Sequence, residues 1–475
     1  MAFFDISSEQ SVGQSEHSVE FDCSSGKPTL IAGWRYDGEC LNVKSDRLGM
    51  IPVFFWHVAD RLVVADTLAE LVERLGEPRF DDEAVATFLA LGYLLDDQTL
   101  ISGVKMLLPG ETLIWRSGNV ARHWVGYPIC RAFSGSRKEA KEEFARLFER
   151  AVASRLAGGV GRLPLSGGRD SRHIALELAK QGCAPPATVV LQSAKGAESP
   201  IAVQVSKHIG VQCLIVPGKL GRVDAEKMKN RSNHYSTDEN DWYLDLLPAL
   251  EGPVFDGLAG DVLCNGLYFD SDVAKKLNDG KLSEAAQRWL DGSSYMPYLR
   301  REYQERWGGE LARRALERAF EPHANAPNPV KSFLFWNRTR REIALLPIAM
   351  AGRVVPVYLP YCDDDLLAFF LSLPWQGYGE QGFHDEVIRE CYPEALGIPY
   401  SSDQNKPKPS SPEWRTLLRN CASMARPLIS PITRIDRIVG YFALAVLTRN
   451  TKQISPAFSK MMPVLQAARE LHVKF

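Results

Sequence analysis

Short runs of β-branched and aromatic residues, separated by turn residues, mark the first part of the chain. The clearest runs lie at residues 30–34, 52–56 and 62–65. Such runs predict strands, because these side chains fit a pleated, half-buried surface. Residues 81–91 open with acidic side chains and continue apolar, which predicts a helix whose first turn favours negative charge. The pattern predicts a sheet-rich first domain over residues 1–130, with a turn between strands at 106–110.

The pattern of apolar and polar residues changes from about residue 136. A long charged stretch at residues 138–156 predicts a helix. Beyond it, short apolar segments predict strands at residues 163–165 and 188–191, and helical segments at 174–182 and 201–210. Strands that alternate with helices predict a parallel sheet with helices on its faces. We assign this second domain to residues 131–475.

Composition and charge restrict the classes of partner. With 475 residues, 45% hydrophobic and 24% charged, the chain is typical of an ordinary globular protein of about two domains. The net charge of -2 gives no overall attraction to nucleic acid or to an anionic membrane. The longest apolar run near the end, residues 438–447, is about half as long as the ~20 residues of a membrane span. It is interpreted as a buried helix.

The cysteines and the start of the chain predict the compartment. Nine cysteines are scattered without a C-x-x-C pair, which argues against a zinc ribbon, an iron–sulfur site or a redox dithiol. The first residues lack a basic segment followed by an apolar one, so no signal peptide is predicted. We expect reduced, mostly buried thiols in a cytoplasmic protein without nucleic-acid or membrane partners.

The sharpest chemical signal lies between a predicted strand and a helix that is predicted to start near Arg172. It consists of Leu165, Ser166, Gly167, Gly168, Arg169, Asp170 and Ser171. The two glycines let the backbone approach an anion, and the helix adds its positive N-terminal end. The Ser166 and Ser171 hydroxyls can donate to phosphate oxygens, whereas Asp170 would repel phosphate unless it holds a bridging Mg²⁺. The alternative is a plain turn in which Asp170 caps the helix.

This loop resembles the pyrophosphate-binding motif S-G-G-x-D-S of the asparagine synthetase family. Further segments are similar to that family's landmarks and follow in the same order, at residues 46–55, 64–66, 92–93, 108–110, 257–261 and 359–363. Together they span roughly residues 30 to 410. The resemblance implies an α/β protein with an α+β first domain. That domain would be a glutaminase-like αββα sandwich, followed by a PP-loop, adenine-nucleotide α-hydrolase-like synthetase domain with a parallel sheet.

The resemblance also implies ATP and Mg²⁺ as cofactors, and it assigns candidate site residues. ATP and its pyrophosphate would contact Leu165, Ser166, Gly167, Gly168, Asp170, Ser171 and Gly260. Asp261 matches the family's second metal-binding acid and would share Mg²⁺ with Asp170; a simple turn aspartate is the alternative. Glu342 lies near the position of an acid that orients a base in ring-forming members, or it belongs to a charged helix face. Lys406 lies where the family has a lysine that stabilises charge on the leaving phosphate; Lys408 and a solvated basic loop are the alternatives.

Three positions depart from the family's pattern. Position 2 is alanine, whereas glutamine-hydrolysing members expose a cysteine there, so that route to ammonia is closed. Leu258 replaces a glutamate or tyrosine, and Val262 replaces a common acid. The chain is therefore similar to the cysteine-less members, which are β-lactam and carbapenam synthetases and the enzymes that close isopeptide rings on lasso peptides. His173 and His234 are interpreted as packing or surface residues.

These features predict an AMP- and pyrophosphate-forming carbon–nitrogen ligase. It would adenylate a small-molecule or peptide carboxylate and join it to an amine, including by lactam or isopeptide ring closure, without glutamine hydrolysis. The alternative is a nucleotide-binding but inert partner in a biosynthetic or polysaccharide pathway, which Ala2, Leu258 and Val262 favour. A tRNA-modifying enzyme with a similar loop is disfavoured by the charge balance and the unpaired cysteines. A homodimer is compatible with these functions.

Overall fold

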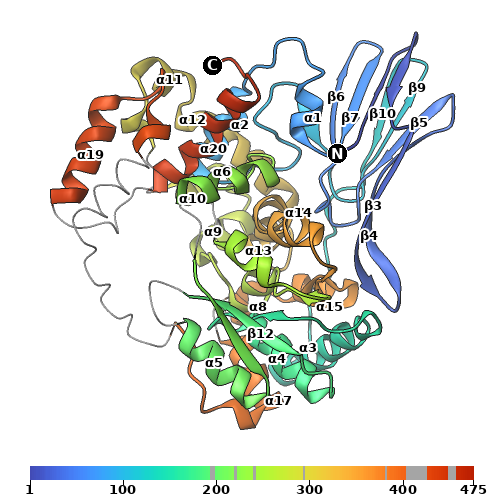
Figure 1. Cartoon of the computed structure of the whole chain (residues 1–475), viewed down its shortest axis with the longest axis vertical. Helices are drawn as coiled ribbons and strands as arrows, with labels where there is room; N and C mark the ends of the chain where they lie inside the picture. Colours follow the sequence, from blue (N-terminus) through green and yellow to red (C-terminus); the bar gives the residue numbers. More distant parts are fainter. Residues whose placement is uncertain are drawn as a thin grey trace.

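The computed structural model describes residues 1–192, 198–218, 222–238, 242–291, 295–379, 382–402, 425–447 and 456–475. In this part of the chain, an N-terminal sandwich of two antiparallel sheets lies beside a second region that combines a parallel sheet with many helices (Figure 1). The predicted fold class is confirmed. No helix of the described residues is both long and apolar enough to cross a membrane.

Two five-stranded sheets form the N-terminal sandwich. The first sheet contains, in order, β2 (Ser11–Gly13), β1 (Phe3–Ile6), β7 (Arg61–Ala65), β6 (Phe54–Val58) and β8 (Val104–Met106). The second contains β10 (Asn119–His123), β9 (Thr112–Arg116), β5 (Cys40–Lys44), β4 (Lys27–Tyr36) and β3 (Glu16–Ser24). Alternate residues of β1 and β4, such as Phe4 and Trp34, are buried in one shared core. The two sheets therefore pack face to face, as alternating antiparallel strands do.

Helices α1 (Leu68–Val72) and α2 (Asp82–Leu91) pack on the first sheet. Asp81 caps α2 by accepting a hydrogen bond from the Ala84 amide, and Gly92 ends the helix in the left-handed conformation. The apolar side chains of α2 share a core with the C-terminal helix α20 (Pro456–Glu470). The end of the chain therefore packs against the N-terminal domain.

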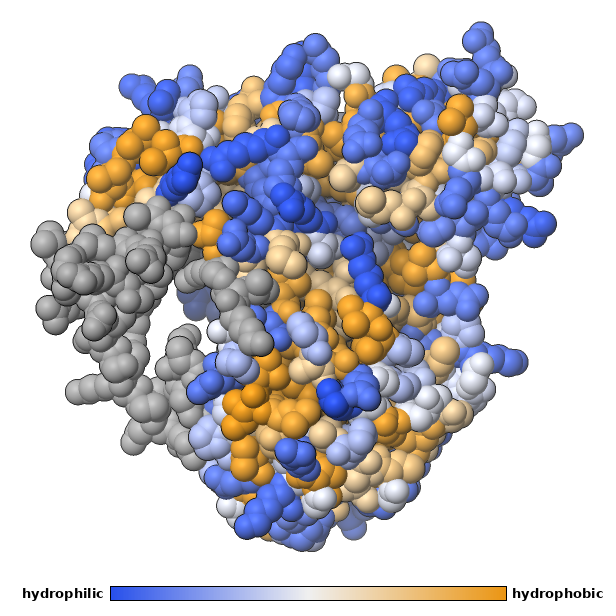
Figure 2. Space-filling view, in the orientation of Figure 1, coloured by the Kyte–Doolittle hydropathy of each residue, from blue (hydrophilic) through white to orange (hydrophobic). Residues whose placement is uncertain are grey.

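A three-stranded parallel sheet, β11 (Leu163–Pro164), β12 (Ala187–Leu191) and β13 (Gln212–Val216), supports the predicted phosphate loop. A second parallel pair joins β14 (Val254–Phe255) to β15 (Val357–Tyr358). The helices around these strands are α3 (Arg137–Ala153), α4 (Asp170–Lys180), α5 (Glu198–His208), α7 (Tyr243–Leu246), α8 (Gly260–Asn265), α15 (Asp364–Ser372) and α17 (Phe383–Cys391). Figure 2 shows apolar residues gathered on the face over the region of α8 and β12.

The remaining helices lie mainly between this sheet and the sandwich (Figure 1). They are α6 (Arg222–Ser232), α9 (Ser271–Asn278), α10 (Leu282–Leu290), α11 (Arg301–Arg306), α12 (Gly309–Phe320), α13 (Pro329–Leu334), α14 (Leu345–Ala349), α16 (Trp375–Tyr378) and α19 (Ile435–Leu447). Directly after α13, residues Phe335–Ile343 form a π-helical segment. Such segments are rare and are often found at functional sites.

Two arginines of the π-helical segment join the two domains. Arg340 and Arg341 both donate to the backbone carbonyl of Asp96, the Arg341 Nη1 atom at 2.9 Å. Arg341 also donates to the carbonyl of Gln98. In return, the Asp96 amide donates to the Asn337 side chain at 2.9 Å. All three π-segment side chains are buried, so the sandwich fixes one side of this segment.

Two local predictions need correction. Helix α4 begins at Asp170, about two residues before the start near Arg172 that the sequence predicts, because the loop turns directly into the helix. The apolar run at 438–447 lies in α19, which is buried on one side only, since Ile438 and Phe442 are 0% and 5% exposed and Val439 is 51% exposed. Among the described cysteines, Cys264 and Cys362 are buried and the others are partly exposed, so most thiols are less buried than expected.

Candidate nucleotide and metal site

The phosphate loop closes on itself between β11 and α4. The Leu165 amide donates to the Val189 carbonyl at 2.8 Å, which keeps the start of the loop on the sheet. The Ser166 amide donates to the Ser171 Oγ at 3.0 Å, and the Gly168 amide donates to the Ser166 Oγ at 3.1 Å. Backbone amides and serine hydroxyls therefore converge at the N-terminus of a helix, which is the arrangement that binds phosphate.

Glycine is required at position 167 by a close neighbour. A Cβ atom there would lie 2.8 Å from the Ser401 Cβ, and the Ser401 amide donates to the Gly167 carbonyl at 3.0 Å. Residues 398–402 are also held by Arg169, which lies in the loop and donates to the Ser402 Oγ at 3.2 Å, and by Arg172, which follows the loop. Arg172 donates to the carbonyls of Ile398 and Pro399 at 2.9 and 2.7 Å. The segment that ends at residue 402 therefore lies against the phosphate loop.

Asp170 lies at the start of α4 and faces the glycine-rich turn before α8. A Cβ atom at Gly260 would lie 2.6 Å from both Cγ and Oδ1 of Asp170. Only a glycine allows this approach, which brings the neighbouring Asp261 to the same place. Burial and the Asp261 charge together raise the pKa of Asp170 well above its usual value. Two carboxylates that repel each other at a phosphate loop are the donor set that a divalent cation stabilises.

The donor set fits Mg²⁺ better than a metal with a protein-only cage. No group of three or more His, Cys, Asp or Glu side chains in the described part of the chain has the arrangement of a metal site. Mg²⁺ is commonly bound by one or two carboxylates together with waters and substrate phosphates. Asp170 and Asp261 supply two carboxylates, and the loop amides would place phosphates beside them.

A chain of buried hydrogen bonds holds Asp170 from behind. Asn265 Nδ2 donates to Asp170 Oδ1 at 3.0 Å, and His384 Nδ1 lies 3.1 Å from Asn265 Oδ1. His173 Nδ1 lies 2.9 Å from His384 Nε2. Burial lowers the pKa of both histidines, that of His384 to about 3, so both rings are neutral at pH 7. One tautomer set satisfies the chain: His384 donates from Nδ1 to Asn265 and accepts from His173 at Nε2.

The sequence did not predict this chain of buried hydrogen bonds. It placed His173 as a packing residue, and it gave Asn265 and His384 no role. Asp256 was also missed: burial raises the pKa of this carboxyl group, which accepts hydrogen bonds from the Leu258 amide at 2.8 Å and the Tyr243 hydroxyl at 3.1 Å. No local signal could identify Asn265 and His384, because their partners lie about a hundred or more residues away along the chain.

Glu342 belongs to a different cluster, in the π-helical segment. It is 2% exposed and pairs with Arg338, whose Nε lies 3.2 Å from Glu342 Oε2. The Arg338 guanidinium lies 4.5 Å from the centre of the Tyr268 ring. Burial raises the pKa of Tyr93, and the Arg338 and Glu342 charges act on it in opposite directions. The π-helical segment packs beside α8, the helix that carries Asp261.

Of the other positions singled out in the sequence, the two lysines are not described and the three apolar residues are buried. Lys406 and Lys408 lie outside the described residues. Leu258 and Val262 are 3% and 1% exposed and belong to the apolar core. Ala2 is buried, and its amide donates to Asp66 Oδ1 at 2.9 Å. The side chain at position 2 is therefore a packed methyl group without a nucleophilic atom.

Comparison with known proteins gives two domain matches. A family model described as asparagine synthase matches residues 143–389, which is more than half of the chain. A model described as a glutamine amidotransferase domain matches residues 30–125. The comparison with curated proteins gives no match. The asparagine synthase match contains the phosphate loop, the Gly257–Asp261 turn and the π-helical segment.

Proposed function

Because the chain belongs to the asparagine synthase family and is an ATP-dependent amide-forming ligase, we propose that it adenylates a substrate carboxylate and joins it to an amine without hydrolysing glutamine. One observation carries the proposal: the packing of Asp170 against Gly260, which unites the phosphate loop with Asp261. The substrate is a small molecule or a peptide. Ring closure within one substrate, to a lactam or an isopeptide, is part of the proposal.

In the first step, a carboxylate oxygen of the substrate attacks the α-phosphorus of ATP and pyrophosphate leaves. The loop amides and the Ser166 and Ser171 hydroxyls bind the phosphates, and Asp170 and Asp261 would hold the Mg²⁺ that accompanies them. When bound, Mg²⁺ neutralises charge on the phosphates. The hydrogen bonds from Asn265 and the His384–His173 pair behind it keep Asp170 in one orientation, so that little reorganisation is needed.

In the second step, an amine attacks the acyl carbon, AMP leaves and the amine loses a proton. Glu342 is a buried acid beside α8, and its pairing with Arg338 fixes its position. We assign it to orienting the group that accepts the proton. We assign Lys406 to stabilising the charge that develops on the leaving phosphate. Earlier in the chain, Ser402 accepts a hydrogen bond from Arg169 at 3.2 Å, which anchors residues 398–402 at the phosphate loop.

The buried alanine at position 2 supports the absence of glutamine hydrolysis. That reaction needs a nucleophile with a terminal amine as its base, and a methyl group cannot supply one. The amine then comes from the substrate itself, from a second substrate or from free ammonia. The sandwich keeps a structural role, because it holds Arg340, Arg341 and Asn337 next to Glu342.

Calorimetric titration with a non-hydrolysable ATP analogue and Mg²⁺ tests the site. We expect binding by the native chain and loss of binding in Asp170→Ala and in Asp261→Ala. Asp279→Ala is a matched control, because Asp279 is a surface aspartate paired with Lys275 at 2.7 Å. Binding that persists unchanged in both site variants would show that the assignment is wrong.

Pyrophosphate release with candidate carboxylates then tests the chemistry. The second candidate function is an inert nucleotide-binding partner, which the two apolar residues Leu258 and Val262 favour. Analogue binding without pyrophosphate release across a broad set of carboxylates, with and without amines, would favour that second function.

A further inference from the structure

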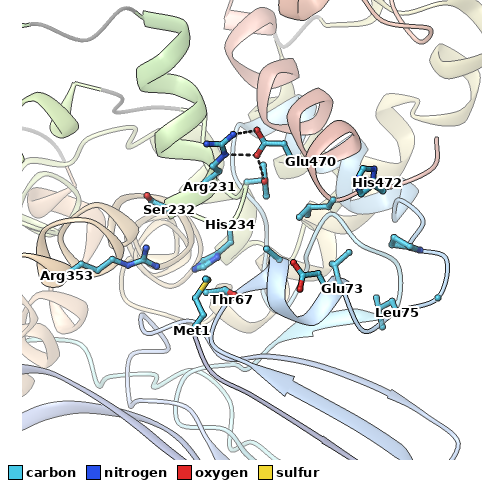
Figure 3. A pocket seen from close by; sticks show the side chains of 16 residues that line it. Met1, Thr67, Glu73, Leu75, Arg231, Ser232, His234, Arg353, Glu470 and His472 are labelled. Carbon is cyan, nitrogen blue, oxygen red and sulfur yellow. Dashed lines mark hydrogen bonds and ion pairs between the residues drawn. The ribbon is translucent and has the colours of Figure 1, made fainter. Parts of the chain in front are cut away.

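A cavity of about 730 Å³ lies at the junction of the N-terminal domain with the helices α6 and α20 (Figure 3). It is separate from the phosphate loop and shares no residue with it. Its size is within the ~300–1,000 Å³ of small-molecule sites. One side is formed by α1 and the residues after it, and the other by the ends of α6 and α20 together with Arg353.

Much of the cavity wall is apolar. Val72, Leu75 and Pro78 come from the N-terminal domain, and Leu471 comes from the residues after α20. The Met1 side chain lies beside His234 and Thr67 (Figure 3). Such a wall binds the apolar body of a ligand, since removing apolar surface from water is favourable.

Two arginines line the polar side of the cavity, and only one of them is paired with a carboxylate among the described residues. Arg231 is neutralised by Glu470, with Nη2–Oε1 and Nε–Oε2 distances of 2.7 and 2.9 Å. Arg353 points into the same space (Figure 3) and has no carboxylate partner among the described residues. The His234 side chain is 5% exposed and makes no hydrogen bond to any other described residue. A guanidinium and an imidazole thus converge without an acceptor in the described part of the chain.

The His234 side chain is uncharged and can donate a hydrogen bond. Burial, followed by the charges of Arg353 and Arg341, lowers its pKa to about 3. A neutral imidazole keeps one N–H group that can donate. The backbone at His234 and Tyr235 is left-handed, with φ of 58° and 60°. Non-glycine residues hold such conformations where the surroundings fix them, and these conformations gather at ligand sites.

We propose that this cavity binds an organic monocarboxylate with an apolar body. The carboxylate lies between Arg353 and His234, and the body packs on Val72, Leu75 and Leu471. A planar guanidinium matches the two oxygens of a carboxylate. A ligand of higher negative charge is disfavoured, because Glu73 and Glu470 also line the cavity. The site is independent of the proposed ligase function, since it involves neither ATP nor the phosphate loop.

Calorimetry and thermal melting of the full chain, in the absence of ATP, test the site with 3-phenylpropionate and hexanoate. The uncharged probe is 3-phenylpropanamide, and inorganic phosphate tests for a general anion site. We expect saturable binding of one carboxylate per chain and a higher melting temperature, with no effect of the amide. In Arg353→Gln, the carboxylate affinity should fall at least about tenfold, as expected for the loss of a charge-assisted pair.

Arg314→Gln is the matched control. Arg314 is an exposed arginine on α12 that pairs with Glu310 at 2.8 Å, and its replacement should leave carboxylate binding unchanged. Because Arg353 is also exposed, both variants should fold. Absence of carboxylate binding to the native chain would overturn the proposal. Equal affinity in Arg353→Gln, or preference for phosphate over both carboxylates, would also overturn it.

Discussion

Replacing Asn265 with alanine tests whether the buried chain behind Asp170 prepares the metal site. The substitution removes the 3.0 Å hydrogen bond from Nδ2 to Asp170 Oδ1. It also removes the acceptor of His384 Nδ1, 3.1 Å away. Asp170 then loses its nearest donor, and its carboxylate can rotate away from Asp261. The loop backbone and both proposed metal ligands remain in the variant.

The expected magnitude follows from the role of the hydrogen bond that Asn265 donates. Partners that orient a metal-binding side chain typically change metal affinity by about 10–100-fold, or roughly 1.4–2.7 kcal/mol. The lost hydrogen bond between His384 and Asn265 costs about 0.5–1.5 kcal/mol of stability in addition, since His384 Nδ1 still lies 3.5 Å from Asp170 Oδ1. We therefore expect Asn265→Ala to require about 10–100-fold more Mg²⁺ for half-maximal binding of the ATP analogue, and to unfold at a lower temperature.

The assay is a Mg²⁺ titration of ATP-analogue binding, below the melting temperature of each variant. Asn278→Ala is the matched control. Asn278 also makes two hydrogen bonds, to the Ala324 carbonyl and from the Trp375 indole, both at 2.9 Å, but it does not contact Asp170. A Mg²⁺ midpoint in Asn265→Ala within twofold of the native value would refute the reasoning. So would an equal shift in Asn278→Ala.

Three further results are expected. Gly260→Ala places a methyl group 2.6 Å from the Asp170 Cγ and should abolish Mg²⁺-dependent analogue binding in calorimetry; binding at native affinity would contradict the packing. His323 has a pKa lowered by burial to about 3, so the folded state binds its proton at lower pH than the unfolded state. Its contribution is complete above pH 6.5 and falls by about 1 kcal/mol between pH 6.5 and 5.5. In urea unfolding, the free energy of unfolding should therefore fall less on acidification in His323→Gln than in the native chain. An equal fall in both proteins would contradict this. Arg341→Met leaves the Asp96 and Gln98 carbonyls with fewer donors and should reduce the free energy of unfolding by about 1.5–3 kcal/mol; an unchanged denaturation midpoint would show that this arginine does not stabilise the domain interface.

The sequence by itself determined the features that depend on neighbours along the chain. The strands at residues 30–34 and 62–65, the capped helix α2 and the strand–loop–helix unit around Gly167 all follow from local patterns of apolar, acidic and glycine residues. The order of the motifs along the chain was sufficient to indicate the family. Alanine at position 2 needs no structure to exclude a thiol there.

Only the tertiary structure decided which of these residues work together. It placed Gly260 against Asp170, paired Arg338 with Glu342, and directed Arg340 and Arg341 to the N-terminal domain. It also assembled the Asp170–Asn265–His384–His173 chain of hydrogen bonds, whose three links join residues that are 95, 119 and 211 positions apart. Periodicity and spacing report only contacts within a few residues, whereas burial and hydrogen bonds between distant segments exist once the chain has packed. The support of the metal site was therefore beyond the reach of sequence reasoning.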